Sequence, residues 1–112
     1  MLAYQSRLTQ EKDFHKVLKY GKVINRKLFV IKVIPNATRK SRCGIIVSNK
    51  ISKKATVRNL LKRQLRFLIR QNLAYFKKPV DMAIIVQSDI RGKNYSQLKE
   101  VFLAALKKDD LI

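Results

Sequence analysis

The sequence predicts an α+β fold, a single α/β sandwich with the element order α-β-β-β-α-β-α. Three observations predict it: runs of alternating or β-branched apolar residues, segments with apolar residues at helical spacing, and turn residues between them. The chain has 112 residues, 46% of them hydrophobic, without repeats or linkers. Residues 1–112 are therefore predicted to form one domain around one modest core.

The first predicted helix spans Leu8–Tyr20, with Thr9 as its cap and Gly21 at its end. Lys22–Ile34 has the composition of a strand, and Cys43–Ser48 is a second strong strand, so two or three strands precede the central helix. One side of the first strand region is expected to face the core: Phe29, Ile31 and Val33. The other side contains a lysine and is expected to be partly wet: Leu28, Val30, Lys32 and Ile34.

The central helix is predicted to begin near Ala55. At about 100° per residue, its polar and basic side chains fall within one arc of roughly 140°: Arg58, Asn59, Lys62, Arg63, Arg66 and Arg70. Apolar side chains take most of the remainder and are expected to face the core: Val57, Leu60, Leu61, Leu65, Phe67 and Leu68. Ile69 falls inside the basic arc, so the separation is imperfect.

After this helix, Val80–Val86 is nearly all apolar and is predicted to be a strand buried on both faces. Asp89–Asn94 forms a loop that contains Gly92. Ser96 can cap a last helix. That helix carries one apolar stripe: Leu98, Val101, Phe102, Ala105 and Leu106.

The charge is the most informative part of the composition. Lys and Arg number 26 against 7 Asp and Glu, a formal net charge of +19, and no acidic residue lies between Asp13 and Asp81. The central helix therefore cannot make ion pairs with acidic residues of its own segment. A polyanionic partner is expected, because such self-repulsion destabilises a compact monomer. Nucleic acid is favoured, with an anionic membrane surface as the alternative.

The same residues argue against an active site in the protein. The seven acids are scattered, and the pair Asp81 and Asp89 is a weak signal for a metal site. With one histidine, His15, and one cysteine, Cys43, there is no zinc set and no Cys-His dyad. Cys43 lies in an apolar run and is expected in the core. A lone cysteine, no signal-peptide pattern and no run of about 20 apolar residues predict a cytoplasmic protein.

The central segment carries a resemblance to a known family. Val47-Ser48-Asn49-Lys50 is followed by Arg58-Asn59-Leu60-Leu61-Lys62-Arg63-Gln64-Leu65-Arg66. This pattern resembles the protein subunit of bacterial ribonuclease P, in which a strand ending in Val-Ser/Ala-Lys-Lys precedes Arg-Asn-Arg, an apolar residue, Lys-Arg and a further Arg. Leu60 stands where the family usually has the second Arg, and Asn49 replaces the first Lys. Further matches extend over nearly the whole chain: Arg7-Leu8, Asp13-Phe14, Val17, Arg42, Gly44 and Asp81.

The resemblance implies a left-handed β-α-β crossover around the central helix. It also implies that the protein assists a catalytic RNA, which holds Mg²⁺ and removes the 5′ leader from precursor tRNA by hydrolysis. No catalytic residue, membrane or protein partner is implied. The residues expected to bind the catalytic RNA are Lys50, Lys53, Lys54, Arg58, Asn59, Lys62, Arg63, Arg66 and Arg70.

The leader is expected to contact the first helix and the sheet. The matching positions are Phe14, Leu18, Val30, Lys32, Ile46 and Ser48. Leu18 and Lys32 replace residues that are often aromatic in the family, and a core position is the alternative for Phe14. Two other functions stay open: a non-enzymatic rRNA-binding protein of similar charge, and a protein-only nuclease, which the scattered acids disfavour.

Overall fold

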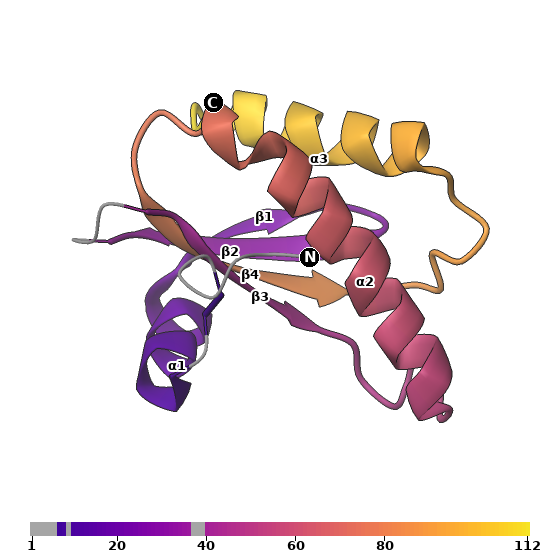
Figure 1. The fold of residues 1–112 in the computed structure, drawn as a ribbon. Coiled ribbons are helices and arrows are strands. Elements are labelled where there is room, and N and C mark those ends of the chain that lie inside the picture. The colour runs from indigo at the N-terminus through magenta and orange to yellow at the C-terminus, as the bar shows by residue number, and fades with distance from the viewer. Residues whose placement is uncertain (1–6, 9, 37–39) are drawn as a thin grey trace.

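A computed structural model describes residues 7–8, 10–36 and 40–112. It contains one four-stranded sheet and three α-helices (Figure 1). In chain order the elements are α1 (Glu11–Tyr20), β1 (Lys22–Asn25), β2 (Phe29–Pro35), β3 (Arg42–Ile46), α2 (Ala55–Asn72), the short 3-10 helix η2 (Leu73–Tyr75), β4 (Val80–Val86) and α3 (Tyr95–Lys108). The predicted α+β class and the predicted element order are confirmed.

The sheet has the strand order β1-β2-β4-β3. β1 with β2 and β2 with β4 are antiparallel, whereas β3 and β4 are parallel neighbours joined through α2. The last strand in the sequence therefore lies inside the sheet and leaves β3 at an edge. Central placement explains why β4 is almost entirely buried, as its apolar composition predicts. The left hand of the β3-α2-β4 crossover stays a prediction.

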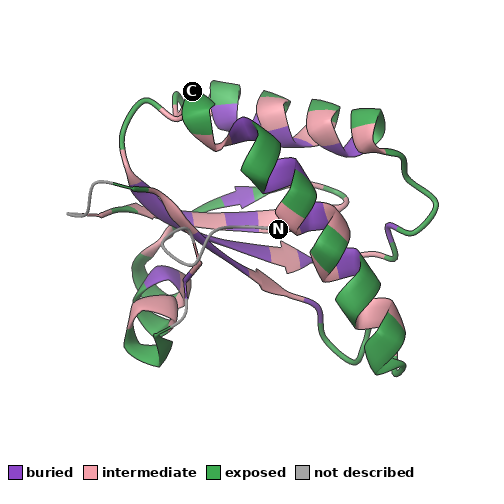
Figure 2. Ribbon diagram, in the orientation of Figure 1, coloured by how far each residue is buried: buried purple, intermediate pink, exposed green. Residues whose placement is uncertain are grey.

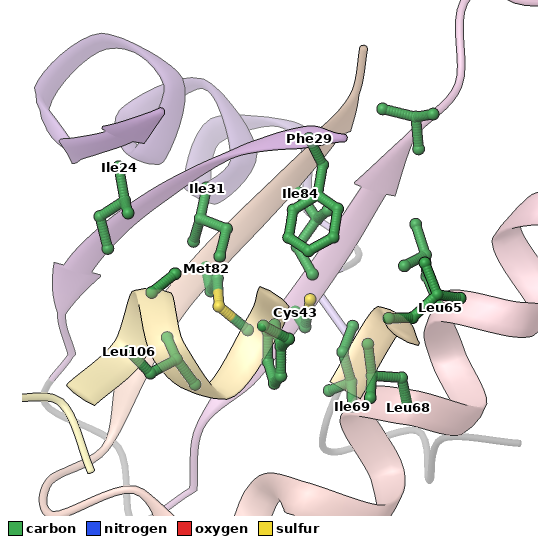
Figure 3. Packing of buried hydrophobic residues seen from close by; sticks show 14 of the residues in the cluster. Ile24, Phe29, Ile31, Cys43, Leu65, Leu68, Ile69, Met82, Ile84 and Leu106 are labelled. Carbon is green, nitrogen blue, oxygen red and sulfur yellow. The ribbon is translucent and has the colours of Figure 1, made fainter. Parts of the chain in front are cut away.

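The two faces of the sheet carry different helices. α2 and α3 pack on one face and build the main core, where Phe29 and Ile31 of β2 meet Ile84 of β4 (Figure 3). α1 packs on the opposite face, around a smaller cluster of Leu8, Val17 and Ala83. The predicted core side of β2 is confirmed, and its other side is half-buried. Cys43 is also in the main core, as predicted.

Several predicted boundaries were wrong. α1 begins at Glu11 because the chain before it pairs with β3, where the amide of Leu8 donates to the carbonyl oxygen of Cys43 at 2.9 Å. The proposed cap Thr9 lies outside the described residues. Lys22–Ile34 divides into two hairpin strands, and β3 ends at Ile46 because the chain then turns, with Ile51 donating to the carbonyl of Ser48.

The cap of α3 was also assigned wrongly. Asn94, not Ser96, accepts a hydrogen bond from the amide of Gln97 at 2.9 Å. The side chain of Gln97 accepts in return from the amide of Asn94, which completes a capping box. The apolar stripe of α3 is confirmed, with Val101 half-buried and the other four residues buried.

The buried side of α2 is narrower than predicted. Its buried apolar residues are Leu61, Leu65, Leu68 and Ile69. Leu60 is 42% exposed and Phe67 is 47% exposed, so the prediction that both face the core was wrong. Ile69, which falls inside the basic arc on the helical count, is fully buried. α2 packs on the edge strand β3 and on α3. The line of side chains that it buries therefore includes Ile69, which the helical count places in the basic arc.

Candidate nucleic-acid interface

The outer side of α2 presents the predicted cationic face, which we define as Arg58, Asn59, Lys62, Arg63, Arg66 and Arg70. Figure 2 shows exposed residues recurring along the length of α2. Asn59, Arg63 and Arg70 are exposed, whereas Arg58, Lys62 and Arg66 are half-buried. Half-burial fits long basic side chains, which can lay their apolar stems on the helix and keep their charges in water.

Arg58 also organises the loop before the helix. Its Nη1 donates to the carbonyl oxygen of Ser52 at 3.0 Å, and the Ser52 hydroxyl accepts from the amide of Lys54 at 3.2 Å. Lys50, Lys53 and Lys54 are exposed in this loop. The first turn of α2 contains no acid, so the partial positive charge of its N-terminus adds to these cations. This end of the helix is therefore suited to phosphate groups.

The cationic face has no acidic counterpart in the part of the chain that the structure describes. The salt bridges found there join Lys22 to Asp109, Arg42 to Asp13 and Asp81, Lys77 to Asp110, and Arg91 to Asp89. None involves a residue of α2. Because phosphate neutralisation by unpaired Lys and Arg is the main source of affinity for nucleic acids, this face is the strongest candidate for a nucleic-acid contact.

Two hollows adjoin the cationic face. The first has a volume of about 520 Å³ and is lined by Asn59, Arg63, Arg66 and Phe67. The second, of about 250 Å³, lies over the β3 edge between α1 and α2. Its lining residues are Arg7, Leu8, Phe14, Cys43, Gly44, Ile45 and Arg66. Arg66 borders both hollows and therefore connects the α2 surface with the α1 side of the sheet.

Phe14 and Lys32 hold α1 against the sheet. The Phe14 ring covers Gly44, where even a Cβ atom would clash with the ring. Lys32 Nζ donates to the carbonyl oxygen of Leu18 at 2.9 Å. This carbonyl lies in the last turn of α1, where carbonyl groups lack helical partners and the helix dipole favours a cation. Phe14, Leu18 and Lys32 are each half-buried, so each combines a packing role with some accessible surface.

Beyond α1, the sheet leaves a row of apolar side chains that α1 does not bury fully. Val30 of β2, Ile85 of β4 and Ile46 of β3 are paired in register and are all half-buried. We call this set the open row. The sequence singled out Val30 and Ile46 but missed Ile85, because an all-apolar strand gives no sign of which position faces outward. Ser48 is exposed and lies after the end of β3 rather than in the row.

The carboxylates are used in structural contacts. Asp81 is 6% exposed and accepts two hydrogen bonds from Arg42, Nε to Oδ1 at 2.8 Å and Nη2 to Oδ2 at 2.6 Å. Asn36 Nδ2 donates to the same carboxylate at 2.9 Å, and Asp13 of α1 lies 3.4 Å from Arg42. The hydrogen bond to Asp81 raises the pKa of Arg42. This network joins α1, β3 and β4.

Asp81 and Asp89 do not form the pair considered from the sequence, since Asp81 lies at the start of β4, Asp89 lies beyond its end, and they bond to different arginines. Among the described residues, no group of three or more His, Cys, Asp and Glu side chains could hold a metal ion. Burial raises the pKa of the Cys43 thiol well above its usual range. The thiol therefore stays protonated and is a poor nucleophile. Neither the carboxylates nor the Cys43 thiol is therefore arranged as a reacting group among the described residues.

In the described part of the chain, no helix combines the length and the apolar character that crossing a membrane requires.

Known proteins provide an independent comparison. The family model Ribonuclease P matches residues 2–109. Ribonuclease P protein components from Synechocystis sp. and Pseudanabaena sp. are 38% identical over 104 residues and 36% identical over 99 residues. Each alignment covers 88% of this chain, and 84% and 85% of the respective relative.

Solved structures agree with this result. The RNase P protein from Thermotoga maritima matches with a TM-score of 0.79 at 32% identity, over 91% of this chain and 96% of that one. The RNase P protein from Staphylococcus aureus, at 23% identity, shares the fold with a TM-score of 0.81, over 95% of this chain and 96% of that one.

Proposed function

Because the chain belongs to the ribonuclease P protein family, we propose that it is the protein subunit of a ribonuclease P holoenzyme. In this role it binds the catalytic RNA through the cationic face of α2 and the loop lysines before it. The open row, Phe14 and their neighbours contact the single-stranded 5′ leader of precursor tRNA. The RNA subunit removes the leader by Mg²⁺-dependent hydrolysis, in the cytoplasm, and the protein strengthens binding of the substrate.

The observation that carries this proposal is the position of the cationic face beside the α1 side of the sheet. Arg66 borders the hollows on both sides, so one RNA on α2 and a second strand near Phe14 would lie next to each other. A cationic helix suits folded RNA through its phosphates, whereas half-buried apolar side chains suit unpaired bases. The two kinds of surface match the two RNAs of the proposed complex.

We assign Mg²⁺ to the RNA subunit. Within the part of the chain that the structure describes, five of the seven carboxylates form salt bridges with Lys or Arg. Hard cations require several oxygen ligands that converge on one point. The carboxylates of Asp13 and Asp81 come near one another only through Arg42, whose positive charge opposes a cation there. The donor set of the described residues therefore does not fit a divalent metal, and no step is assigned to one on the protein.

Reconstitution tests the proposal directly. The protein is combined with the catalytic RNA of the same organism, and cleavage of precursor tRNA is followed at low Mg²⁺. We expect the protein to increase cleavage over that by the RNA alone, and to be inactive without RNA. An rRNA-binding protein would give no increase. Cleavage by the protein alone would instead support the protein-only nuclease.

Leu60 gives a prediction specific to this chain. It replaces an arginine expected from the family pattern, and it is exposed on an unbroken helix. Leu60→Arg should bind the catalytic RNA about fivefold more tightly and steepen the plot of log affinity against log salt by about one phosphate contact. Leu and Arg have similar helix propensities, so the stability of α2 should not change. Leu60→Gln is the matched control, and an equal gain with Gln would exclude a phosphate contact.

Phe14→Leu tests the leader surface. Leucine keeps an apolar side chain over Gly44 but removes the aromatic ring. We expect binding of precursor tRNA by the reconstituted holoenzyme to weaken about fivefold while binding of mature tRNA stays unchanged, because stacking of bases on an aromatic ring is lost. Tyr20→Leu, at the exposed end of α1, is the control. Equal weakening for both tRNAs would assign Phe14 to packing alone.

A further inference from the structure

Phe67 is an aromatic residue exposed beside a cationic surface. It lies on α2, is 47% exposed, and lines the hollow of about 520 Å³ together with Asn59, Arg63 and Arg66. Asn59 and Arg63 lie eight and four positions before it, on the same side of the helix, and Arg66 directly precedes it on the neighbouring side. The volume falls within the range of ~300–1,000 Å³ that is usual for small-molecule sites. The hollow thus combines one ring, two guanidinium groups and one amide.

The Phe67 ring is held in place before any ligand binds. It meets the ring of Tyr95 from α3 edge-on, with centroids 5.4 Å apart and planes at 70°. The Tyr95 hydroxyl accepts a hydrogen bond from Asn72 Nδ2 at 3.3 Å, and Asn72 is 1% exposed. Asn72 is fixed in turn by donating to the carbonyl of Leu68 at 2.7 Å. Such an arrangement reduces the entropy cost of binding to the ring.

Packing alone does not explain this residue. The T-shaped contact engages Tyr95 yet leaves nearly half of Phe67 in contact with solvent. The exposed part of the ring, beside the arginines, gains nothing from burial until a ligand covers it. Leu60, two turns earlier on the same side of α2, is also exposed. The cationic face of this chain is therefore bordered by an apolar strip that phosphate contacts cannot use.

We propose that this hollow binds an unpaired base of the catalytic RNA, stacked on Phe67. Arg63 and Arg66 neutralise the phosphates that flank the base, and the Asn59 amide bonds to the base edge or the ribose. A paired base cannot reach the ring, because in a helix its faces are covered by its neighbours. The proposal rests on the proposed function and adds to it a nucleobase site on the α2 surface, next to the phosphate contacts.

The first test separates stacking from charge. Phe67→Leu should weaken binding of the catalytic RNA about tenfold, equivalent to about 1.4 kcal/mol, with an unchanged salt slope. Phe67→Tyr, which keeps the ring, should bind like the wild type. Polyphosphate, a polyanion without bases, should bind both variants equally well. Arg63→Gln is the contrasting variant: it should weaken binding of both ligands and lower the salt slope.

The second test observes the site itself. The chain contains no tryptophan, so Phe67→Trp introduces a single reporter whose fluorescence a stacked base quenches. We expect quenching by the catalytic RNA but not by polyphosphate. Tyr75→Trp is the matched control, because Tyr75 is exposed but lies outside this hollow and should not respond.

Three results would decide against the nucleobase site. Unchanged RNA affinity in Phe67→Leu would overturn it, as would an absence of quenching in Phe67→Trp. Equal weakening in Phe67→Leu and Phe67→Tyr, together with a lower unfolding temperature, would assign Phe67 to packing against Tyr95. In each case, a continued loss of affinity in Arg63→Gln would leave the proposed function standing. If Arg63→Gln also had no effect, Arg63 would not contact a phosphate, and the reconstitution described above would decide the proposed function.

Discussion

Replacing Arg42 with methionine is expected to lower the free energy of unfolding by about 3 kcal/mol. Methionine keeps much of the apolar stem but leaves Asp81 with a buried charge whose cationic partner is missing. Of the hydrogen bonds to that carboxylate described above, only the one donated by Asn36 then remains. The value is placed at the low end of the range for buried pairs because the Arg42 side chain is 23% exposed. Urea denaturation of both proteins measures the difference.

The Arg42 network should also matter for the position of α1, because Arg42 connects Asp13 of that helix to β4. Amide hydrogen exchange in α1 should therefore increase more than exchange in β2. Arg91→Met is the matched control, since it breaks an exposed pair with Asp89. Exposed pairs contribute little, so its urea midpoint should equal that of the wild type. A midpoint for Arg42→Met that equals the control would refute a structural role for the network.

The second large effect is expected from neutralising the centre of the cationic face. The triple variant Lys62→Gln, Arg63→Gln and Arg66→Gln removes three charges while keeping side chains that favour helix. If each contacts one phosphate, the slope of log affinity against log salt should fall by about two to three, and affinity at ~0.1 M salt should fall by about two orders of magnitude. Filter binding of the catalytic RNA over a salt series measures both quantities.

A change in net charge alone must be separated from the loss of local contacts. The control variant replaces three exposed lysines elsewhere, Lys93, Lys107 and Lys108, with glutamine. It loses the same three charges, so long-range attraction falls equally in both variants. We expect the control to change affinity less than about threefold at ~0.1 M salt, where exposed charges are screened beyond about 10 Å. Equal losses in both variants would show that RNA binding does not depend on the α2 face.

Much of the fold follows from local sequence patterns. The strand Val80–Val86 has the predicted bounds, and α2 begins at Ala55, where the sequence predicts a start nearby, because apolar runs and helical periodicity are strong signals. Boundaries set by contacts from elsewhere were wrong. Leu8 pairs with Cys43 instead of entering the first helix, and no local pattern records a partner that lies in another strand.

The residues of the candidate site also fall into those that the sequence predicts and those that it does not. The cationic residues of α2 could be read from the sequence, since their spacing and the missing acids are local properties. The exposure of Phe67 could not be read, because it depends on how far α2 rotates over the β3 edge and α3. Ile85 was missed for a similar reason: only its register with Val30 and Ile46 places it in the open row.

The sequence by itself determined the α+β class, the cationic helix and the family, because composition, periodicity and motif spacing are carried by neighbouring residues. Only the tertiary structure decided which apolar residues stay uncovered, how Arg42 joins three elements, and that Arg66 borders two hollows. These features arise from contacts between distant segments. Their energies depend on burial and geometry, which packing sets after the local elements have formed.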